Sequence, residues 1–315
     1  MANNNWVSYS PHIKQKNNSS KRLYLTMLIS LIPAIVFGVI INGINSLFIY
    51  FVCVPLTTGL DILLNSIKNH KFTFNDFSSI LVGVLIAMSM PAGIPVYYPI
   101  LGCIVSVVFI KFCVGGVGKN FVSEVAVAKV LTFIVFANAC SKYISISTKE
   151  LTNETVLMGL LNGNLPEGGF LKTFLGIGTG GLGESAILCL LIGGIALCVL
   201  KVIDYKIPLV YLISVFLFSG IFMGFKFAPY YLLSGGAVFC AFYCLTDYAS
   251  SPDTVLGRIL YAFLTGFVTV LIWKFSKNYE LGAYYATLIG GLVFGAVKGY
   301  YAPKFAGEKK HENVK

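Results

Sequence analysis

The chain has 315 residues, of which 57% are hydrophobic and only 11% are charged, and its mean hydropathy is +0.81. A soluble protein has about a quarter of its residues charged, so this composition excludes a soluble globular domain and predicts a protein that lies in the lipid bilayer. The net charge of +10 does not indicate nucleic-acid binding, because the Lys and Arg residues are scattered at the ends of apolar segments.

Ten apolar segments follow one another along the chain, and a helix that crosses the bilayer needs about 20 mostly apolar residues. Strands of a membrane barrel would alternate between apolar and polar residues, which these segments do not. The expected fold is therefore an all-α integral membrane protein. The ten segments are 23–41, 46–64, 78–90, 97–114, 121–138, 186–203, 207–225, 229–245, 256–273 and 282–301.

The ten segments divide into five and five around a long polar connection, and an odd number in each half predicts two halves of opposite orientation. The third segment is short and interrupted at Met90-Pro91, and the eighth is short and contains Ser234-Gly235-Gly236. Paired broken segments are typical of inverted-repeat membrane proteins with a central site. The expected parts are a tail (1–22), a first repeat (23–138), a loop (139–185), a second repeat (186–301) and a tail (302–315).

The distribution of basic residues predicts the orientation of the chain in the membrane. Sixteen of the 23 Lys and Arg residues fall on the side of the two termini and six on the side of the long loop, with Lys129 left within a segment. Because basic residues accumulate on the cytoplasmic side, both termini are expected in the cytoplasm and the loop 139–185 outside it.

Three ionisable residues within or at the end of apolar segments are candidates for an ion pathway. Charge within the bilayer is costly unless it is paired or faces a cavity. Glu124 and Lys129 lie five residues apart in the fifth segment, a spacing that makes a direct ion pair imperfect, and Glu124 can instead lie at the membrane surface. Asp247 ends the short eighth segment.

The remaining residue types that carry chemistry point to no catalytic residue and no metal site. The eight cysteines form no C-x-x-C pair, and most lie in apolar segments, where Cys is usually a small hydrophobe. The glycine-rich stretch 176–185 lacks the lysine of a phosphate loop. It stands at the start of the sixth segment, where Ser185 or Glu184 can cap the helix and free N–H groups can receive a phosphate.

An ordered set of motifs covers nearly the whole chain and resembles the D subunit of the Rnf complex and, more distantly, the B subunit of the sodium-translocating NADH:quinone oxidoreductase. The motifs are SYSPHI (8–13), GGVGKN (115–120), GGLGESAILCLLIGGI (180–195), KIPLVYL (206–212), LLSGGAVFCAFYCLTDYASSP (232–252) and GRILYAFLTGFVTVLIW (257–273).

The resemblance implies a bacterial inner-membrane subunit of a ferredoxin:NAD oxidoreductase that couples electron transfer to sodium or proton translocation. It implies FMN attached covalently through its phosphate to a threonine, and a second flavin, riboflavin, bound without a covalent bond. The implied partners are the other Rnf subunits: A and E in the membrane, the flavoprotein RnfG, and B and C on the ferredoxin and NAD side. No NAD-reducing site is expected on this chain.

The family carries its flavin on the threonine of a pattern resembling Ser/Thr-x-Ala-Thr-Pro-Leu, and LTNETVLMGL is the stretch that aligns with it. Thr155 matches the flavin-bearing threonine, Leu157 the leucine and Thr152 the upstream hydroxyl residue, whereas Glu154 and Val156 depart from the pattern. The apolar VLMGLL after Thr155 is expected on the membrane surface. The other residues expected around the cofactor are Gly115, Gly116, Asn120, Gly180, Gly181, Gly183, Glu184, Ser185, Ser234, Gly235 and Asp247.

Other interpretations of the same features are a plain loop threonine or a glycosylation sequon at Asn153-Glu154-Thr155. The alternative for the whole chain is a stand-alone inverted-repeat transporter or channel for a small polar solute, because broken helices in two inverted halves are typical of transporters.

Overall fold

A computed structural model describes residues 20–69, 77–113, 122–144, 151–152, 154–166, 169–176, 180–247, 250–252, 254–276 and 278–301. Within these ranges the chain is mostly helical. Four helices in this part of the chain are long and apolar enough to cross a membrane, and they cover 21–42, 46–67, 206–223 and 255–275. The expected helical membrane protein is therefore present.

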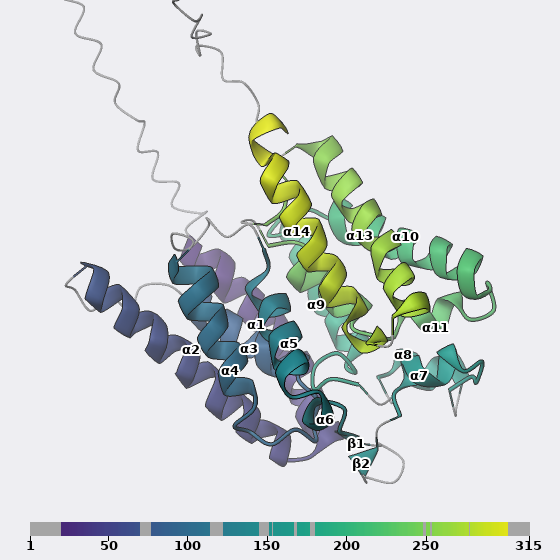
Figure 1. The fold of residues 1–315 in the computed structure, drawn as a ribbon, viewed down its shortest axis with the longest axis horizontal. Coiled ribbons are helices and arrows are strands. Elements are labelled where there is room, and N and C mark those ends of the chain that lie inside the picture. The colour runs from purple at the N-terminus through teal and green to yellow at the C-terminus, as the bar shows by residue number, and fades with distance from the viewer. Residues whose placement is uncertain are drawn as a thin grey trace, which may run out of the picture.

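The described residues of the first half form six α-helices and one π-helix (Figure 1). They are α1 (Ser20–Asn42), α2 (Asn45–Asn69), α3 (Ser78–Ser89), α4 (Pro99–Val105), which continues directly into the π-helix η1 (Ser106–Cys113), α5 (Glu124–Val135) and α6 (Ala137–Cys140). Helix α3 has only 12 residues and ends where Met90 turns extended before Pro91, because a residue before proline is driven out of the helical conformation. The interruption predicted for the third segment is thus present.

The connection between the halves is more ordered than a plain loop. It contains β1 (Tyr143–Ile144) and β2 (Leu151–Thr152), which pair antiparallel, and the short helices α7 (Val156–Leu161) and α8 (Gly169–Phe174). The prediction of an all-helical protein did not include these two strands, because a strand of two residues produces no recognisable pattern in the sequence.

The VLMGLL stretch is helix α7, and its position at the membrane surface stays a prediction. The side chains of Leu157 and Leu160 are only 1% and 3% exposed and belong to the hydrophobic core. Their three-residue spacing places both leucines on one face of the helix, and this face packs into the protein.

The second half begins at α9 and is broken in its third segment. Its elements are α9 (Ile187–Val199), α10 (Lys206–Met223), α11 (Ala228–Leu232), α12 (Ala237–Phe239), the π-helix η2 (Cys240–Cys244), α13 (Val255–Phe275), the 3₁₀ turn η3 (Tyr279–Leu281) and α14 (Gly282–Tyr301). Between α11 and α12, Gly235 and Gly236 have φ angles of 59° and 68°. Glycine adopts this left-handed conformation at little cost, so the predicted break at these glycines is present.

The helices of the two halves form two neighbouring groups, drawn from purple to blue and from green to yellow in Figure 1. Helix α1 of the first group packs on α9 of the second, and α5 packs on α14. Apolar side chains such as Ile40, Phe51 and Ile221 are 64–72% exposed, whereas Thr57 and Thr269 are fully buried. Large exposed apolar surfaces of this kind are unsuited to water and fit a lipid environment.

Candidate functional site

A narrow pocket lies where three connections meet: the start of α7, the turn that precedes α9, and the break between α11 and α12. The short turn η3 closes it. Its free volume is about 30 Å³, which is room for only a few water-sized groups. The residues that line it are Thr155, Val156, Leu157, Thr173, Gly180, Glu184, Ser185, Ile187, Leu233, Ser234, Gly235, Gly236 and Glu280.

Thr155 is held in this pocket by two interactions of its hydroxyl group. The residue is the N-cap of α7, and its Oγ1 atom accepts a hydrogen bond from the backbone N–H of Met158 at 3.2 Å. The same hydroxyl donates to Oε1 of Glu280, and the residue is only 5% exposed. Threonine is a favoured N-cap residue because it satisfies a free N–H group of the first helical turn, so Thr155 stabilises the start of α7.

The turn 180–186 is fixed against the C-terminal end of α3. The backbone N–H groups of Leu182 and Gly183 donate to the carbonyl oxygens of Met90 and Met88, each at 2.8 Å. A Cβ atom on Gly183 would collide with the side chain of Met88, so only glycine allows this close approach. These contacts direct the Glu184 side chain toward the interior of the bundle.

Lys129 of α5 is the buried cation of the site and is only 1% exposed. Its Nζ atom lies 3.4 Å from Oε1 of Glu184 and donates to the carbonyl oxygen of Ser89, the last residue of α3. The Tyr284 hydroxyl of α14 donates to the same oxygen of Glu184. A cation at the C-terminal end of α3 is favoured by the helix dipole, and the carboxylate compensates the burial of its charge.

Glu280 connects Thr155 with Tyr143. Its Oε1 atom accepts from the Thr155 hydroxyl, and its Oε2 atom accepts from the Tyr143 hydroxyl at 3.5 Å. The pKa of Glu280 is raised to about 7, and burial is the largest cause; Glu184 also raises it, whereas the hydrogen bonds from Thr155 and Tyr143 and the charge of Lys129 lower it. Burial also raises the pKa of Tyr143 well above its ordinary value. The Tyr143 hydroxyl therefore keeps its proton and donates a hydrogen bond, and both the protonated and the charged form of the Glu280 carboxyl are populated near neutral pH.

A second and larger pocket lies beside the first, and Glu280 lines both. Its free volume is about 300 Å³. Apart from Glu280 and a few polar groups, its walls are apolar and aromatic, so it suits a flat apolar group better than a charged one. Besides Glu280, the walls of this second pocket consist of Phe133, Ile134, Ala137, Ser141, Tyr143, Asn278, Tyr279 and Leu281.

Six of the residues predicted around the cofactor line the first pocket together: Thr155, Gly180, Glu184, Ser185, Ser234 and Gly235. Gly181 and Gly183 belong to the same turn but contact the end of α3 instead of lining the pocket. Asp247 lies after η2, beyond the far end of the broken segment, and is absent from the pocket lining. Gly115, Gly116 and Asn120 lie outside the described residues.

The predicted cap of the sixth segment is wrong. The N-cap of α9 is Ala186, which makes no side-chain cap, because Glu184 is turned inward to Lys129 and Tyr284. The Oγ atom of Ser185 is buried and makes no hydrogen bond within the described part of the chain. A buried hydroxyl group without a partner is costly, so Ser185 offers a donor to whatever enters the pocket.

The ion-pathway candidates of the fifth segment do not pair with each other. Lys129 instead contacts Glu184, which is 55 residues away in sequence. Glu124 is 9% exposed and lies in the first turn of α5, where the helix dipole favours a negative charge.

Glu280, Tyr284 and Tyr143 are site residues that no motif in the sequence had indicated. Glu280 and Tyr284 lie at the start of the last apolar segment. The only sign in the sequence that could have indicated a site there is the acidic residue Glu280 next to an apolar run. Among the residues that the structure describes, no three His, Cys, Asp or Glu side chains form a metal site.

Comparison with known proteins gives a consistent result over the whole chain. The sequence is 28% identical to the D subunit of the Na(+)-translocating ferredoxin:NAD(+) oxidoreductase complex of Acetobacterium woodii over 308 residues, which covers 96% of both chains. It is 27% identical to the D subunit of the Proton-translocating ferredoxin:NAD(+) oxidoreductase complex of Clostridium ljungdahlii, again over 96% of both chains. The D subunit of an Ion-translocating oxidoreductase complex of Methanosarcina acetivorans is 27% identical over 97% of this chain and 98% of its own.

The pattern shared by the NQR2, RnfD, RnfE family matches residues 6–307, which include every element of the site described above. The resemblance found in the sequence motifs is thereby confirmed, and the chain belongs to the NQR2, RnfD, RnfE family.

Proposed function

We propose that this chain is the membrane flavoprotein subunit of an ion-translocating ferredoxin:NAD oxidoreductase complex and that it carries FMN on Thr155 through a phosphoester bond. Family membership and the names of its relatives support the complex. The observation that carries the flavin site is the pocket itself, which brings Thr155 together with two glycine-rich turns that are distant in sequence.

The pocket around Thr155 has room for a phosphate group but not for a whole flavin. The buried Ser185 hydroxyl is a donor that has no partner among the described residues. Gly180, Gly235 and Gly236 line the wall without side chains, and the acidic residues Glu184 and Glu280 line it as well. The free volume of about 30 Å³ is too small for a three-ring system, so the proposed role of this pocket is to hold the phosphate end. FMN supplies one- and two-electron transfer to the complex, and riboflavin is proposed as a second, non-covalent flavin.

Variants of Thr155 separate its proposed attachment role from its role as a helix cap. Thr155→Ser keeps both the hydroxyl group and the cap, Thr155→Asn keeps a cap without a hydroxyl group, and Thr155→Ala loses both. After co-expression with a flavin transferase, we expect ultraviolet fluorescence of the denatured protein band in wild type and Thr155→Ser only. Fluorescence of the Thr155→Asn band at the wild-type level would show that the flavin is attached elsewhere or not covalently.

We also propose that the two halves are inverted five-segment repeats, with ten segments in the membrane. In the first half α2 packs on α3 and α4, and α4 packs on α5; in the second half α10 packs on α11 and α13, and α13 packs on α14. This correspondence makes α1 equivalent to α9 and α5 equivalent to α14, and both of these pairs are in contact. Contacts between equivalent helices are expected along the axis that relates two repeats.

The proposed orientation has both termini in the cytoplasm of a bacterial cell and the Thr155 connection on the opposite side, as the distribution of Lys and Arg supports. We place the ion pathway near Lys129 and Glu184, because these charges lie where α5 meets α14. Glu124 and Asp247 remain further candidates.

The proposed partners are the other Rnf subunits, namely A and E in the membrane, the flavoprotein RnfG, and B and C, with the reaction at NAD assigned to a partner. The alternative, a stand-alone transporter, predicts solute movement in liposomes that hold the flavin-free chain and no electron donor.

A further inference from the structure

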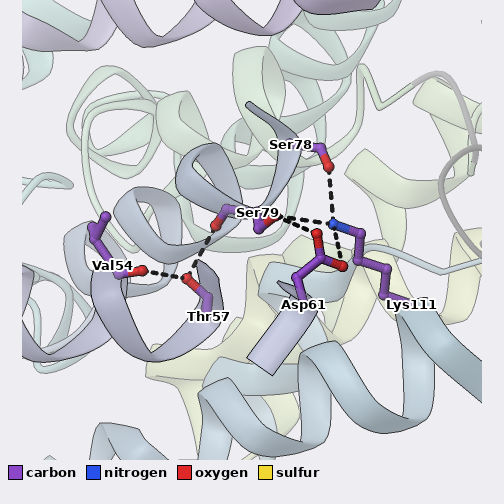
Figure 2. A network of polar contacts seen from close by, with 6 residues as sticks. All are labelled: Val54, Thr57, Asp61, Ser78, Ser79 and Lys111. Carbon is purple, nitrogen blue, oxygen red and sulfur yellow. Dashed lines mark hydrogen bonds and ion pairs between the residues drawn. The ribbon is translucent and has the colours of Figure 1, made fainter. Parts of the chain in front are cut away.

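A second cluster of buried polar side chains lies at the N-terminal end of α3 and joins it to α2 and η1 (Figure 2). The ammonium group of Lys111 is 3.1 Å from Oδ1 of Asp61, and it donates to the hydroxyl oxygens of Ser78 and Ser79 at 2.9 and 3.3 Å. Lys111 is only 4% exposed. Three oxygen atoms from two helices thus surround one buried positive charge.

Two of the three oxygen-bearing groups of this cluster, Asp61 and Ser79, have contacts that do not involve Lys111. The Ser79 hydroxyl donates to Oδ2 of Asp61 at 2.7 Å, and the Thr57 hydroxyl lies 3.0 Å from the backbone carbonyl oxygen of Ser79. Gly83 brings α3 so close to α2 that a Cβ atom there would lie 2.9 Å from the Cα atom of Val54. The positions of Asp61 and Ser79 therefore depend on the packing of α2 against α3 and not on the lysine alone.

We propose that Asp61, Ser78 and Ser79 form a binding site for a monovalent cation, and that the Lys111 ammonium group is a tethered occupant which exchanges with an inorganic ion such as sodium. Carboxylate and hydroxyl oxygens are the ligands preferred by hard cations. A single carboxylate balances one positive charge, so the site suits a monovalent ion better than a divalent one.

The element that carries Lys111 supplies a route for the exchange. Residues 106–113 form a π-helix of eight residues, whereas π-helical geometry is rare and mostly limited to single turns at functional sites. Rewinding of η1 to ordinary α-helical geometry would change the direction in which Lys111 points. The ammonium group would then leave the oxygen atoms, which belong to α2 and α3.

Helix α3 connects this site to the candidate site around Lys129. Ser78 and Ser79 begin the helix, and Ser89, whose carbonyl oxygen accepts from Lys129, ends it. A rigid helix therefore has a buried lysine at each end. The inference deepens the ion-translocation part of the proposed function, but its test needs neither flavin nor electron transfer, so the two proposals can fail independently.

The test compares the thermal unfolding of purified Lys111→Met protein in sodium chloride and in choline chloride of the same concentration. We expect Lys111→Met to unfold at a lower temperature than wild type in choline chloride, because Asp61 is left without a cation. Sodium is expected to raise this temperature by several degrees in a saturable way, since a ligand that binds only the folded state stabilises it. Wild type is expected to show a weaker sodium response that needs a higher concentration, because the Lys111 ammonium group competes for the same oxygen atoms; a wild type without any sodium response would contradict the exchange.

The matched control is the double variant Lys111→Met with Asp61→Asn, which removes both charges and is expected to respond equally to sodium and choline. If Lys111→Met does not fold, the same measurement is made on Lys111→Gln, whose slightly shorter side chain keeps a hydrogen-bond donor. Equal unfolding temperatures of the lysine variant in the two salts overturn the proposal, as does a sodium response that persists when Asp61 is replaced.

Discussion

At the scale of single residues, Glu280 is the side chain most sensitive to pH in the candidate site. It accepts a hydrogen bond from Thr155, and its pKa is raised to about 7, first by burial. A phosphoester on Thr155 would remove the hydrogen that this hydroxyl donates and would bring negative charge toward Glu280. The flavinylated protein is therefore expected to hold Glu280 in its protonated form over a wider pH range than the unmodified protein.

Glu280→Gln is expected to remove a pH-dependent part of the stability of the unmodified protein. Because the folded-state pKa lies above the ordinary value of 4.5, the folded protein binds more protons than the unfolded chain between these values. This stabilisation is complete below pH 4.5 and is lost as the pH rises to about 7, with a magnitude on the order of 3 kcal/mol at most. Denaturation from pH 4.5 to 8, without flavin transferase, should give a flatter profile for Glu280→Gln than for wild type.

Glu154→Gln is the control, because it removes an exposed carboxylate from the same segment and should leave the profile unchanged. A wild-type profile that rises with pH across this window would contradict the assignment of a raised pKa to Glu280.

The residues of the site show which part of it the sequence can reveal. Thr155 and the glycines of the two turns belong to continuous motifs, so the resemblance placed them without knowledge of the fold. Glu280 contacts Thr155 across 125 residues of sequence, and Tyr284 contacts Glu184 across 100. Such contacts depend on how the helices pack, and a single sequence holds no information on which distant side chains meet.

At the scale of elements, the break between α11 and α12 sets the shape of the pocket that holds Thr155. Gly235 and Gly236 have left-handed φ angles and turn the backbone there toward Leu157 and Glu184. The sequence predicted the interruption, because glycines within an apolar segment favour a bend. It did not predict the π-helical turns η1 and η2, since no residue pattern distinguishes them from an α-helix.

Gly235→Ala is expected to destabilise the protein by about 1–3 kcal/mol, since a residue with a Cβ atom is strained at a positive φ angle. The new Cβ atom would also lie 3.0 Å from Leu157 and from Trp273. Flavin attachment at Thr155 should fall in parallel, because Leu157 belongs to the helix that Thr155 caps. Chemical denaturation and in-gel fluorescence measure the two effects.

Gly159→Ala, within the helix α7 that Thr155 caps, is the matched control. A Cβ atom there would meet only a backbone oxygen at 3.9 Å, and alanine favours the helical conformation of α7. A loss of stability as large as that of Gly235→Ala would show that the strain at Gly235 is not the cause.

At the scale of the whole molecule, the two halves meet through close contacts between helices that are equivalent in the proposed repeats. The charge count and the division into five and five segments suggested this arrangement from the sequence. The helix pairs that form the contacts could not be predicted, because apolar residues cover all sides of the long segments and give no preferred face.

Gly193 of α9 lies at a close approach between α1 and α9. A Cβ atom there would lie 2.5 Å from the carbonyl oxygen of Ser30 and 2.7 Å from the Tyr243 hydroxyl. Gly193→Val is therefore expected to separate the two halves and to destabilise the protein by about 1–3 kcal/mol, the usual cost of overpacking. Its thermal unfolding temperature in detergent should fall below that of wild type.

Ile192→Val provides the comparison, because Ile192 is the adjacent residue of α9 and is 57% exposed toward the surroundings. It should unfold close to wild type. Equal behaviour of the two variants would contradict a tight contact between the halves at Gly193.

The shortness of α3 has an electrical consequence. Its 12 residues span about 18 Å, whereas the hydrocarbon core of a bilayer is about 30 Å thick. In the proposed ten-segment arrangement, the polar groups at both ends of the helix would concentrate the membrane voltage across this shorter, poorly polarisable stretch, and the local field there would be stronger. A unit charge that moves from one end of α3 to the other would then cross most of the transmembrane voltage, at about 2.3 kcal/mol per 100 mV.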